Sequence, residues 1–338
     1  MLAFAVRRTI VGVVMLIAMS LVVFLLFFGS PVDAAKFACG QKCNDVAVAA
    51  TSKSLGYDQP VYEQWGSFMA GLVKGRDYPL DPKMREEAPE TISHCAAPCL
   101  GFSQLDQQTV NAELKDAIPI SVSLGILAII LWLSIGILFG VLAAVVKGSI
   151  FDRAIVGLSL LLFAFPTFFI GTLLLEFVSI KWGLYPIPEY VSIADGGVGS
   201  WAVNLLLPSL TLAVFYMAAY VRMSRAFVLE SLSEDYIRTA RAKGLKGRTV
   251  LFKHGLRAAL TPLVSMAGLD VAAVLGGAVI TEQVFNYPGL GKLAVTASNN
   301  FDLPILVGLV LMLGALVIVA NIIVDILYAY IDPRVRVS

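Results

Sequence analysis

The sequence predicts an all-α membrane protein with six transmembrane helices. Hydrophobic residues make up 58% of its 338 residues and charged residues only 14%, which lies outside the range of soluble globular chains. A spanning helix needs about 20 predominantly apolar residues, because lipid cannot satisfy unpaired backbone groups. Six nearly uncharged runs of about that length occur between polar or Pro/Gly-rich breaks. They cover residues 9–28, 118–146, 154–180, 202–221, 262–285 and 304–328.

The first run belongs to a segment of residues 1–28 that also carries Arg7 and Arg8. A cleaved secretory signal is one interpretation of a basic start followed by an apolar stretch. No small-x-small cleavage site stands out at residues 29–35. We therefore expect an uncleaved first span.

A long first connection, residues 29–117, follows the first span and is expected to form a small ordered subdomain. It contains aromatic and aliphatic anchors and turn clusters, and its apolar spacing predicts a helix from Pro60 to Val73. Two roles stay open for this connection. It caps the outer mouth of the protein, or it docks a protein that delivers substrate.

All four cysteines lie in the first connection, as two C-x-x-x-C pairs: Cys39, Cys43, Cys95 and Cys99. In an oxidising compartment four cysteines usually form two disulfides, with three possible connectivities that the sequence does not resolve. A zinc site with four thiolate ligands is the alternative, and His94 adds only a little to it. Structural zinc pairs favour a two-residue spacer and a reduced compartment, so we predict disulfides and no metal site.

Basic residues in the short connections predict which ends face the cytosol. Nine Lys and Arg residues crowd residues 222–257, and Lys147 and Arg153 flank the second connection. The remaining short connections carry only Lys181 and Lys292. Both termini are therefore expected in the cytosol, together with the fourth connection, whereas the first connection faces outside.

Residues 118–338 are predicted to form a core of five helices. Within it, the fourth connection, residues 233–262, carries the strongest local signals. Ser233 is predicted to cap a helix with two acidic residues in its first turn, where the helix dipole favours them. Gly244 is predicted to stop it in the left-handed conformation. A second short helix is expected from about Arg248 until Pro262 opens the fifth span. A solvated loop is the alternative, but caps and stops indicate a helix held rigid.

The sequence DYIRTARAKGL at residues 235–245, followed by HGLRAALTP at residues 254–262, resembles the "EAA" loop of ABC-importer permeases. More narrowly, it resembles the first, B-type permease of the dipeptide/oligopeptide/nickel group. Ala240 and Gly244 keep the alanine and glycine of that motif. Arg238 and Thr239 stand where its glutamate and first alanine would be, a departure that is usual in the peptide group.

This resemblance implies a type I ABC importer permease fold, in which the short helix sits in a cleft of a separate ATPase. The ATPase-coupling residues expected from it are Glu234, Asp235, Tyr236, Arg238, Thr239, Ala240, Arg241, Lys243, Gly244 and Leu245.

Other stretches resemble the same group. EQVFNYPGLGK at residues 282–292 is similar to its extracytoplasmic turn between the fifth and sixth helices, and residues 321–334 are similar to its closing sequence. The start of the chain is similar too, although the usual Pro-Gly-Asp-Pro is absent near Pro31. For the cysteine-bearing first connection no resemblance is identified. The gate or turn residues expected from the resemblance are Glu282, Phe285, Pro288, Gly289 and Gly291.

Three polar residues, Asp270, Asn321 and Asp325, fall inside predicted spans, where such groups are costly and commonly functional. Asp270 lies about 12 Å into the fifth span at 1.5 Å per residue, so a role in the pathway or in helix pairing is favoured. Asp325, one turn after Asn321, is expected to have a structural role at the interface.

No catalytic residues are expected in this chain. Gly289 to Lys292 echo a phosphate-binding loop, but Asn286 and Leu293 occupy positions that Walker A reserves for glycine and a hydroxyl residue. No cofactor is therefore expected here, and the resemblance implies that ATP and Mg²⁺ bind to partner ATPases.

The resulting prediction is a subunit of an ATP-driven importer in a prokaryotic plasma membrane, forming half of a pathway for di- or oligopeptides. The resemblance implies a homologous second permease, two ATPase subunits or one ATPase used twice, and an extracytoplasmic substrate-binding protein. Membrane lipid surrounds the chain, and no nucleic acid is expected. Nickel or another small solute remains open as the substrate, and a stand-alone secondary transporter or channel is the competing class. That class predicts inverted repeats, and none stands out.

Overall fold

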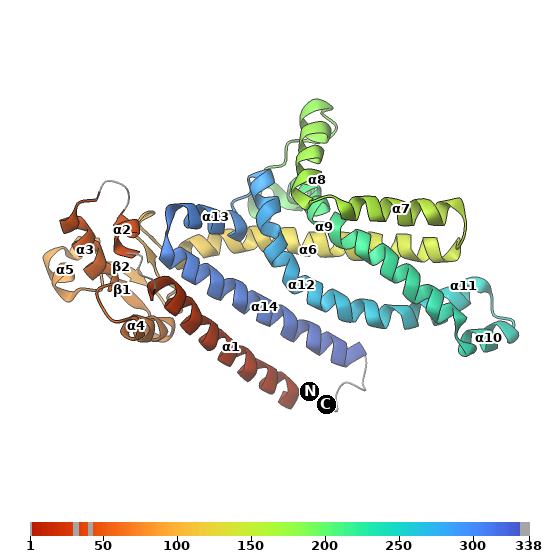
Figure 1. The fold of residues 1–338 in the computed structure, drawn as a ribbon, viewed down its shortest axis with the longest axis horizontal. Coiled ribbons are helices and arrows are strands. Elements are labelled where there is room, and N and C mark those ends of the chain that lie inside the picture. The colour runs from red at the N-terminus through yellow and green to blue at the C-terminus, as the bar shows by residue number, and fades with distance from the viewer. Residues whose placement is uncertain (1, 30–33, 40–42, 332–338) are drawn as a thin grey trace. The chain divides into compact units, whose positions relative to one another are not determined.

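The computed structural model describes residues 2–29, 34–39 and 43–331, and these are almost entirely helical (Figure 1). The N-terminal half contains α1 (Leu2–Phe28), α2 (Ala34–Cys39), α3 (Asp45–Leu55), α4 (Val61–Lys74), β1 (Arg76–Tyr78), α5 (Pro82–Glu87), η1 (Pro89–Thr91), β2 (Ser93–Cys95), β3 (Phe102–Ser103) and β4 (Gln108–Thr109). Then follow α6 (Val110–Val145), α7 (Ile150–Ala164), α8 (Thr167–Leu173), the π-helix η2 (Leu174–Lys181), α9 (Ile193–Ser233), α10 (Asp235–Ala242), α11 (Gly247–Thr249), the π-helix η3 (Val250–Leu256), α12 (Arg257–Phe285), α13 (Leu290–Asn300) and α14 (Leu303–Ile331).

The chain divides into two compact units, which are described separately. Of the described residues, those within 2–119 and 288–319 form the N-terminal unit, and residues 120–287 and 320–331 form the core unit.

Within the described residues, four helices are long and apolar enough to cross a membrane: α1, α6, α9 and α14. A fifth crossing results if α7 and the helix from Thr167 to Lys181 count as one span, although they are bent by 102°. The apolar run predicted over residues 154–180 is therefore helical but interrupted by a bend. Helix α7 ends at Ala164, because Phe165, as the residue before a proline, avoids the α region and Pro166 donates no hydrogen bond.

The N-terminal unit has an apolar core between helices and a small stapled region. Strands β1 and β2 pair antiparallel, as do β3 and β4. The predicted helix over residues 60–73 is present as α4, and its Trp65 donates a hydrogen bond from Nε1 to Ser20 on α1 at 3.1 Å. Phe68 of α4 packs against Phe24 of α1, with ring centroids 4.9 Å apart. These contacts join α4 to the first apolar helix.

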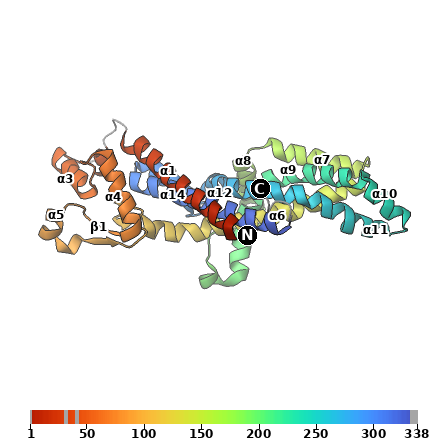
Figure 2. The same cartoon turned by 90° about the horizontal axis from the view of Figure 1, so that it is seen from below.

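The core unit is built around α6, α9 and α12. Glycines on α6 let α9 approach closely, since a Cβ on Gly136 would lie 2.8 Å from the Tyr220 side chain. Trp132 of α6, which is fully buried, stacks on Tyr216 of α9 at 4.7 Å. Beyond this core, α7 runs beside α9 (Figure 2).

Candidate functional site

The fourth connection folds as a short helix set on the end of a long one. Helix α9 continues to Ser233, and α10 begins two residues later at Asp235. Glu234, in an extended conformation with φ of −68° and ψ of 152°, makes the corner between them. Only one residue separates the two helices. The orientation of α10 relative to α9 is therefore set by the backbone angles of Glu234.

Apolar packing holds α10 against the π-helix η3. Ile237 is fully buried, and it forms a small cluster with Ala240 and Val250 against which Leu232 packs. Burying one isoleucine side chain contributes roughly 1.5–3 kcal/mol. The cluster therefore fixes one face of α10 and leaves its other face exposed.

Hydrogen bonds from Ser231 reinforce the corner. Its Oγ donates to the carbonyl of Gly255 at 2.9 Å and lies 2.7 Å from the hydroxyl of Tyr236. Leu232 packs closely on Gly255, where a Cβ would lie 2.8 Å from Cδ2 of that leucine. Thus α9, α10 and η3 meet at a single buried serine.

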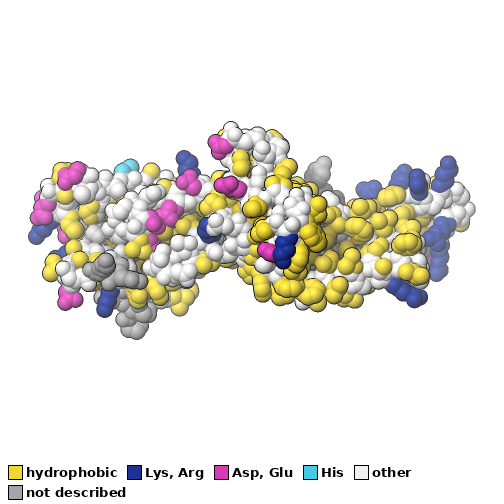
Figure 3. Space-filling view, turned by 90° about the horizontal axis from the view of Figure 1, so that it is seen from above, with side chains coloured by type: hydrophobic (Ala, Val, Ile, Leu, Met, Phe, Trp, Pro, Cys, Tyr) yellow, Lys and Arg dark blue, Asp and Glu magenta, His cyan; other side chains and the backbone are white. Residues whose placement is uncertain are grey.

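The exposed face of this region is basic. Arg238, Arg241, Lys243, Lys246 and Arg248 are all exposed, and Figure 3 shows Lys and Arg side chains gathered where α10 and α11 lie. Two grooves border α10, one between Lys147, Leu229 and Arg241, the other between Phe227, Tyr236 and Pro262. The region is a positively charged projection with an apolar groove on each side. Its charge complements that of an acidic partner.

The structure confirms one predicted helix signal in the fourth connection and corrects two others. Gly244 adopts the left-handed conformation with φ of +77° and ends the helix, as predicted. Ser233 does not cap α10, because its hydroxyl donates instead to the carbonyl of Glu230 at 2.6 Å. Pro262 does not open the fifth span but lies inside α12, which begins at Arg257 directly after η3. The expected second short helix is therefore continuous with that span.

An ion pair that the sequence did not suggest joins the helices behind this region. Arg225 of α9 donates from Nε and from Nη2 to the two carboxylate oxygens of Asp152 on α7, at 2.6 and 2.8 Å. The Asp152 carboxylate also accepts the backbone N–H of Gly148 at 2.9 Å and is only 4% exposed. The only signal in the sequence was opposite charge near the ends of two predicted spans, which does not identify partners 73 residues apart.

The predicted gate residues fall in both units. In the core unit, Glu282 is 1% exposed and accepts a hydrogen bond from Ser121 at 2.5 Å, and Phe285 is buried. Tyr287 donates to the carbonyl of Asn204 at 2.8 Å. Burial raises the pKa of the Tyr287 phenol, which therefore stays a neutral donor.

In the N-terminal unit, Gly289 precedes the first turn of α13, and Gly291 is buried within it. Pro288 stands exposed just before that helix. These residues form the start of α13.

Among the predicted intramembrane polar residues, Asp270 pairs two helices. Its carboxylate accepts a hydrogen bond from Tyr220 of α9 at 2.7 Å. Asn321 is partly exposed on α14. The side chain of Asp325 lies outside the described residues.

The cysteines pair locally, Cys39 with Cys43 and Cys95 with Cys99. His94 lies 2.5 Å from Asp77 on the surface of the N-terminal unit. Across the described residues, no group of three or more His, Cys, Asp or Glu side chains could hold a metal ion.

Two family models match the chain. The one described as "Binding-protein-dependent transport system inner membrane component" matches residues 136–337. The corresponding model for the N-terminal part matches residues 1–125. Together they include all of the elements just described except a short stretch within α6.

Curated relatives match over nearly the whole length. A probable peptide ABC transporter permease protein, y4tP, of Sinorhizobium fredii is 33% identical over 98% of both chains. A putative peptide transport system permease protein of Brucella abortus is 34% identical, and the dipeptide transport system permease protein DppB of Escherichia coli K12 is 32% identical, each over 99% of both chains.

A solved structure shares the fold. The MetNI methionine ABC transporter, in an inward-facing conformation, matches with a TM-score of 0.53 at 17% identity. The match covers 65% of this chain and 96% of that one. At this identity the likeness concerns the fold alone.

Proposed function

Because the chain belongs to the family of inner membrane components of binding-protein-dependent transport systems, we propose that it forms half of a pathway that imports short peptides. It is a multi-pass permease subunit of an ABC importer in the plasma membrane, and ATP hydrolysis takes place on partner subunits. The peptide substrate follows the names of its full-length relatives.

The coupling role belongs to α10. The observation that supports it is that Ile237 is fully buried while Arg238 and Arg241 on the same helix are exposed. Such a helix is anchored on one side and free to enter a cleft on the other. The exposed residues from Glu234 to Leu245 then contact the ATPase.

Motion of α10 is passed on through rigid contacts. A displacement of the helix reaches α9 through the one-residue corner, and it reaches η3 and α12 through Ser231 and the Ile237 cluster. The Asp152–Arg225 pair carries it further to α7, which ends at the bend before Pro166. A bend at a proline is a place where a helix yields.

The topology that fits this role has six spans with both termini in the cytosol. In it, α12 is the sixth crossing besides α1, α6, the bent pair, α9 and α14. The basic fourth connection then faces the ATPases, and the disulfide-bearing first connection faces the oxidising side.

The complete importer contains a second permease, two ATPase subunits and an extracytoplasmic binding protein. ATP and Mg²⁺ bind to the ATPases. Glu282, Phe285 and the turn at residues 288–291 form the outer gate. Asp270 contributes its carboxylate within the spans.

A proline at position 244 tests the coupling role. Gly244 has a φ of +77°, whereas proline requires about −65°, so Gly244→Pro distorts the end of α10 without touching a span. We expect peptide uptake in proteoliposomes, and stimulation of the ATPase by loaded binding protein, to fall at least about 100-fold while membrane insertion stays normal. Gly247→Ala, which changes a nearby glycine with open space around it, should keep both activities. Normal uptake by Gly244→Pro would disprove the coupling role.

A further inference from the structure

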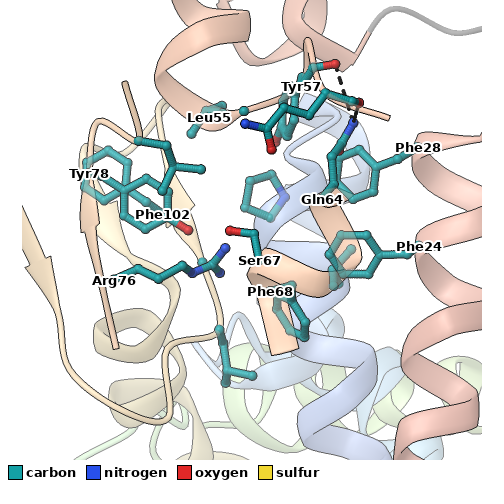
Figure 4. Close-up of a pocket in the computed structure, with 17 residues that line it drawn as sticks. Phe24, Phe28, Leu55, Tyr57, Gln64, Ser67, Phe68, Arg76, Tyr78 and Phe102 are labelled. Atoms are coloured by element: carbon teal, nitrogen blue, oxygen red, sulfur yellow. Dashed lines mark hydrogen bonds between the residues drawn. The ribbon is translucent and has the colours of Figure 1, made fainter. Parts of the chain in front are cut away.

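The N-terminal unit contains a cavity of about 50 Å³ that the coupling mechanism does not use (Figure 4). One wall is aromatic, from Phe24 and Phe28 at the end of α1 and Phe68 of α4. The first turn of α14 adds Pro304 and Val307. The cavity therefore lies where two apolar helices meet the stapled subdomain of the first connection.

Arg76 projects into this cavity from β1. Residues alternate between the two faces of a strand, so Arg76 and Tyr78 share the face that lines the cavity, and Asp77 faces away towards His94. The Arg76 guanidinium lies 5.5 Å from the centroid of the Phe68 ring and 5.4 Å from that of Tyr78. In Figure 4 it points towards the middle of the cavity, with Phe24 and Phe28 on the opposite side.

The backbone makes room for this arginine. A Cβ on Gly71 would lie 2.7 Å from Cδ of Arg76, so any larger residue there would displace the side chain. Pairing of Arg76 with Cys95 in the sheet, and the Cys95–Cys99 disulfide, fix the strand from the other side. Several independent elements thus hold a cation in an apolar site.

Two polar atoms in the cavity wall have no partner. The Nε of Arg76 and the hydroxyl of Tyr57 are both buried, and neither makes a hydrogen bond. No carboxylate of the described residues forms an ion pair with Arg76. Burial raises the pKa of Tyr57 well above its usual value, so its hydroxyl remains a donor. Buried donors beside an unpaired cation are costly unless an acceptor joins them.

We propose that this cavity binds the carboxylate of a small molecule with an apolar body, namely the C-terminal residue of a short peptide. Arg76 and Tyr57 donate to the carboxylate oxygens, which occupy the cavity, and the phenylalanines contact the first carbon atoms of the apolar side chain, the rest of which lies in the mouth. That the carboxylate belongs to a peptide rests on the proposed function. The site would hold the carboxyl end of the substrate on this subunit before it enters the pathway.

The size of the cavity favours a carboxylate over a lipid phosphate. One water occupies about 10–15 Å³ of such volume, so 50 Å³ accommodates only a few non-hydrogen atoms. A carboxylate has one substituent, which leaves through the mouth. A phosphodiester has two substituents and is bulkier, so it does not fit.

The test is binding of the dipeptide Ala-Leu to the full-length chain in lipid nanodiscs, followed by isothermal titration calorimetry. Ala-Leu should bind, whereas its C-terminal amide should bind at least about tenfold more weakly, because a charged acceptor is lost. Arg76→Gln should weaken the binding of Ala-Leu by about tenfold or more, and Tyr57→Phe by about fivefold. Gly71→Ala keeps every lining group but should weaken binding by displacing Arg76.

Matched controls separate local contacts from general effects. Lys74→Gln removes an equal charge two residues from Arg76, and Tyr62→Phe removes an exposed hydroxyl, so both should bind Ala-Leu like the parent chain. If Arg76→Gln does not fold, the binding of Ala-Leu by Tyr57→Phe, which preserves the shape of the side chain, tests the proposal instead. Absence of binding by the parent chain, equal binding of the amide, or undiminished binding by Tyr57→Phe and Gly71→Ala would overturn the proposal.

Two further measurements show whether a negative result concerns the peptide as occupant, the cavity site or the proposed function. Laurate carries the same carboxylate on a lipid chain, and Arg76-dependent binding of laurate without binding of Ala-Leu would overturn the peptide as occupant. Uptake of Ala-Leu by the assembled importer is measured in parallel. Uptake without Arg76-dependent binding would refute the cavity site and leave the proposed function intact, whereas binding without uptake of any peptide would refute the proposed function and leave a carboxylate site.

Discussion

The fourth connection and the first connection are both polar segments between apolar helices, but they are stabilised in opposite ways. In the fourth, one isoleucine cluster and one serine fix α10 to the helices that flank it. In the first, two disulfides, two small sheets and an aromatic core hold a subdomain together. The fourth connection has only a small cluster of three buried residues, which packs on Leu232 of α9, so it moves with its helices, and this suits a lever. The first has its own core, which suits a binding surface.

The largest effect is expected at Ile237, the fully buried residue that anchors α10. Ile237→Asp places a charge in a fully buried position, and it should detach α10 and reduce peptide uptake at least about 100-fold. Co-purification of the ATPase with the tagged permease, and uptake in proteoliposomes, measure this. Ile237→Val, which loses one methylene group and about 1 kcal/mol, is the control and should retain most activity. Full uptake by Ile237→Asp would show that α10 is not a lever.

A somewhat smaller effect is expected at the link between α9 and α7. Asp152→Asn removes the charge that pairs with Arg225, and the loss is moderate because Arg225 is partly exposed. We expect less peptide transported per ATP hydrolysed, with the ATPase still bound. Exchanging the two residues, Asp152→Arg with Arg225→Asp, should restore part of that ratio. If Asp152→Asn transports as much peptide per ATP as the parent chain, the motion of α10 is transmitted through α9 and α12 and not through α7.

The first connection should respond to loss of a covalent link instead. Replacing Cys95 and Cys99 by alanine removes a short closed loop whose chain entropy corresponds to roughly 2 kcal/mol. The N-terminal unit should unfold at a lower temperature, while binding of the ATPase is unaffected. Cys39 and Cys43 close a loop of equal length but are not buried, so their replacement should lower the unfolding temperature less. Loss of ATPase binding in the Cys95 and Cys99 variant would contradict the independence of the two connections.

The smallest effect is a dependence on pH confined to the N-terminal unit. Burial raises the pKa of Asp302, although hydrogen bonds from Ser103 and from the backbone of Ile305 lower it in part. The folded state therefore holds this proton more tightly than the unfolded chain. The stabilisation that Asp302 contributes is greatest below the ordinary aspartate pKa of about 3.9. It declines as the pH rises from there through the raised pKa of the folded state.

The variant Asp302→Asn should abolish this decline. Thermal unfolding of a chain with Trp65 as its only tryptophan reports on the N-terminal unit at each pH. Asp45→Asn, which changes an exposed aspartate, should leave the decline in place. An unchanged slope in Asp302→Asn would assign the dependence to another group.

Much of the candidate site was predictable because its signals are local. A glycine after a basic last turn marks a left-handed stop, and Gly244 adopts that conformation. The role of Ser233 was not predictable in the same way. A serine before two acidic residues has the composition of a cap, but α9 extends far enough that Ser233 lies in its last turn and bonds to Glu230. Where one helix ends depends on its packing, which local composition does not report.

The sequence by itself determined the apolar helices, the helical stop at Gly244 and the family resemblance. These depend on residue composition and on spacing within one segment, where the physics of lipid and of the backbone leaves few alternatives. Only the tertiary structure decided the disulfide pairing, the Asp152–Arg225 pair and the cavity around Arg76. Each of these requires groups from distant segments, or one choice among equivalent partners, to be brought within contact distance. That choice is made by packing of the whole chain.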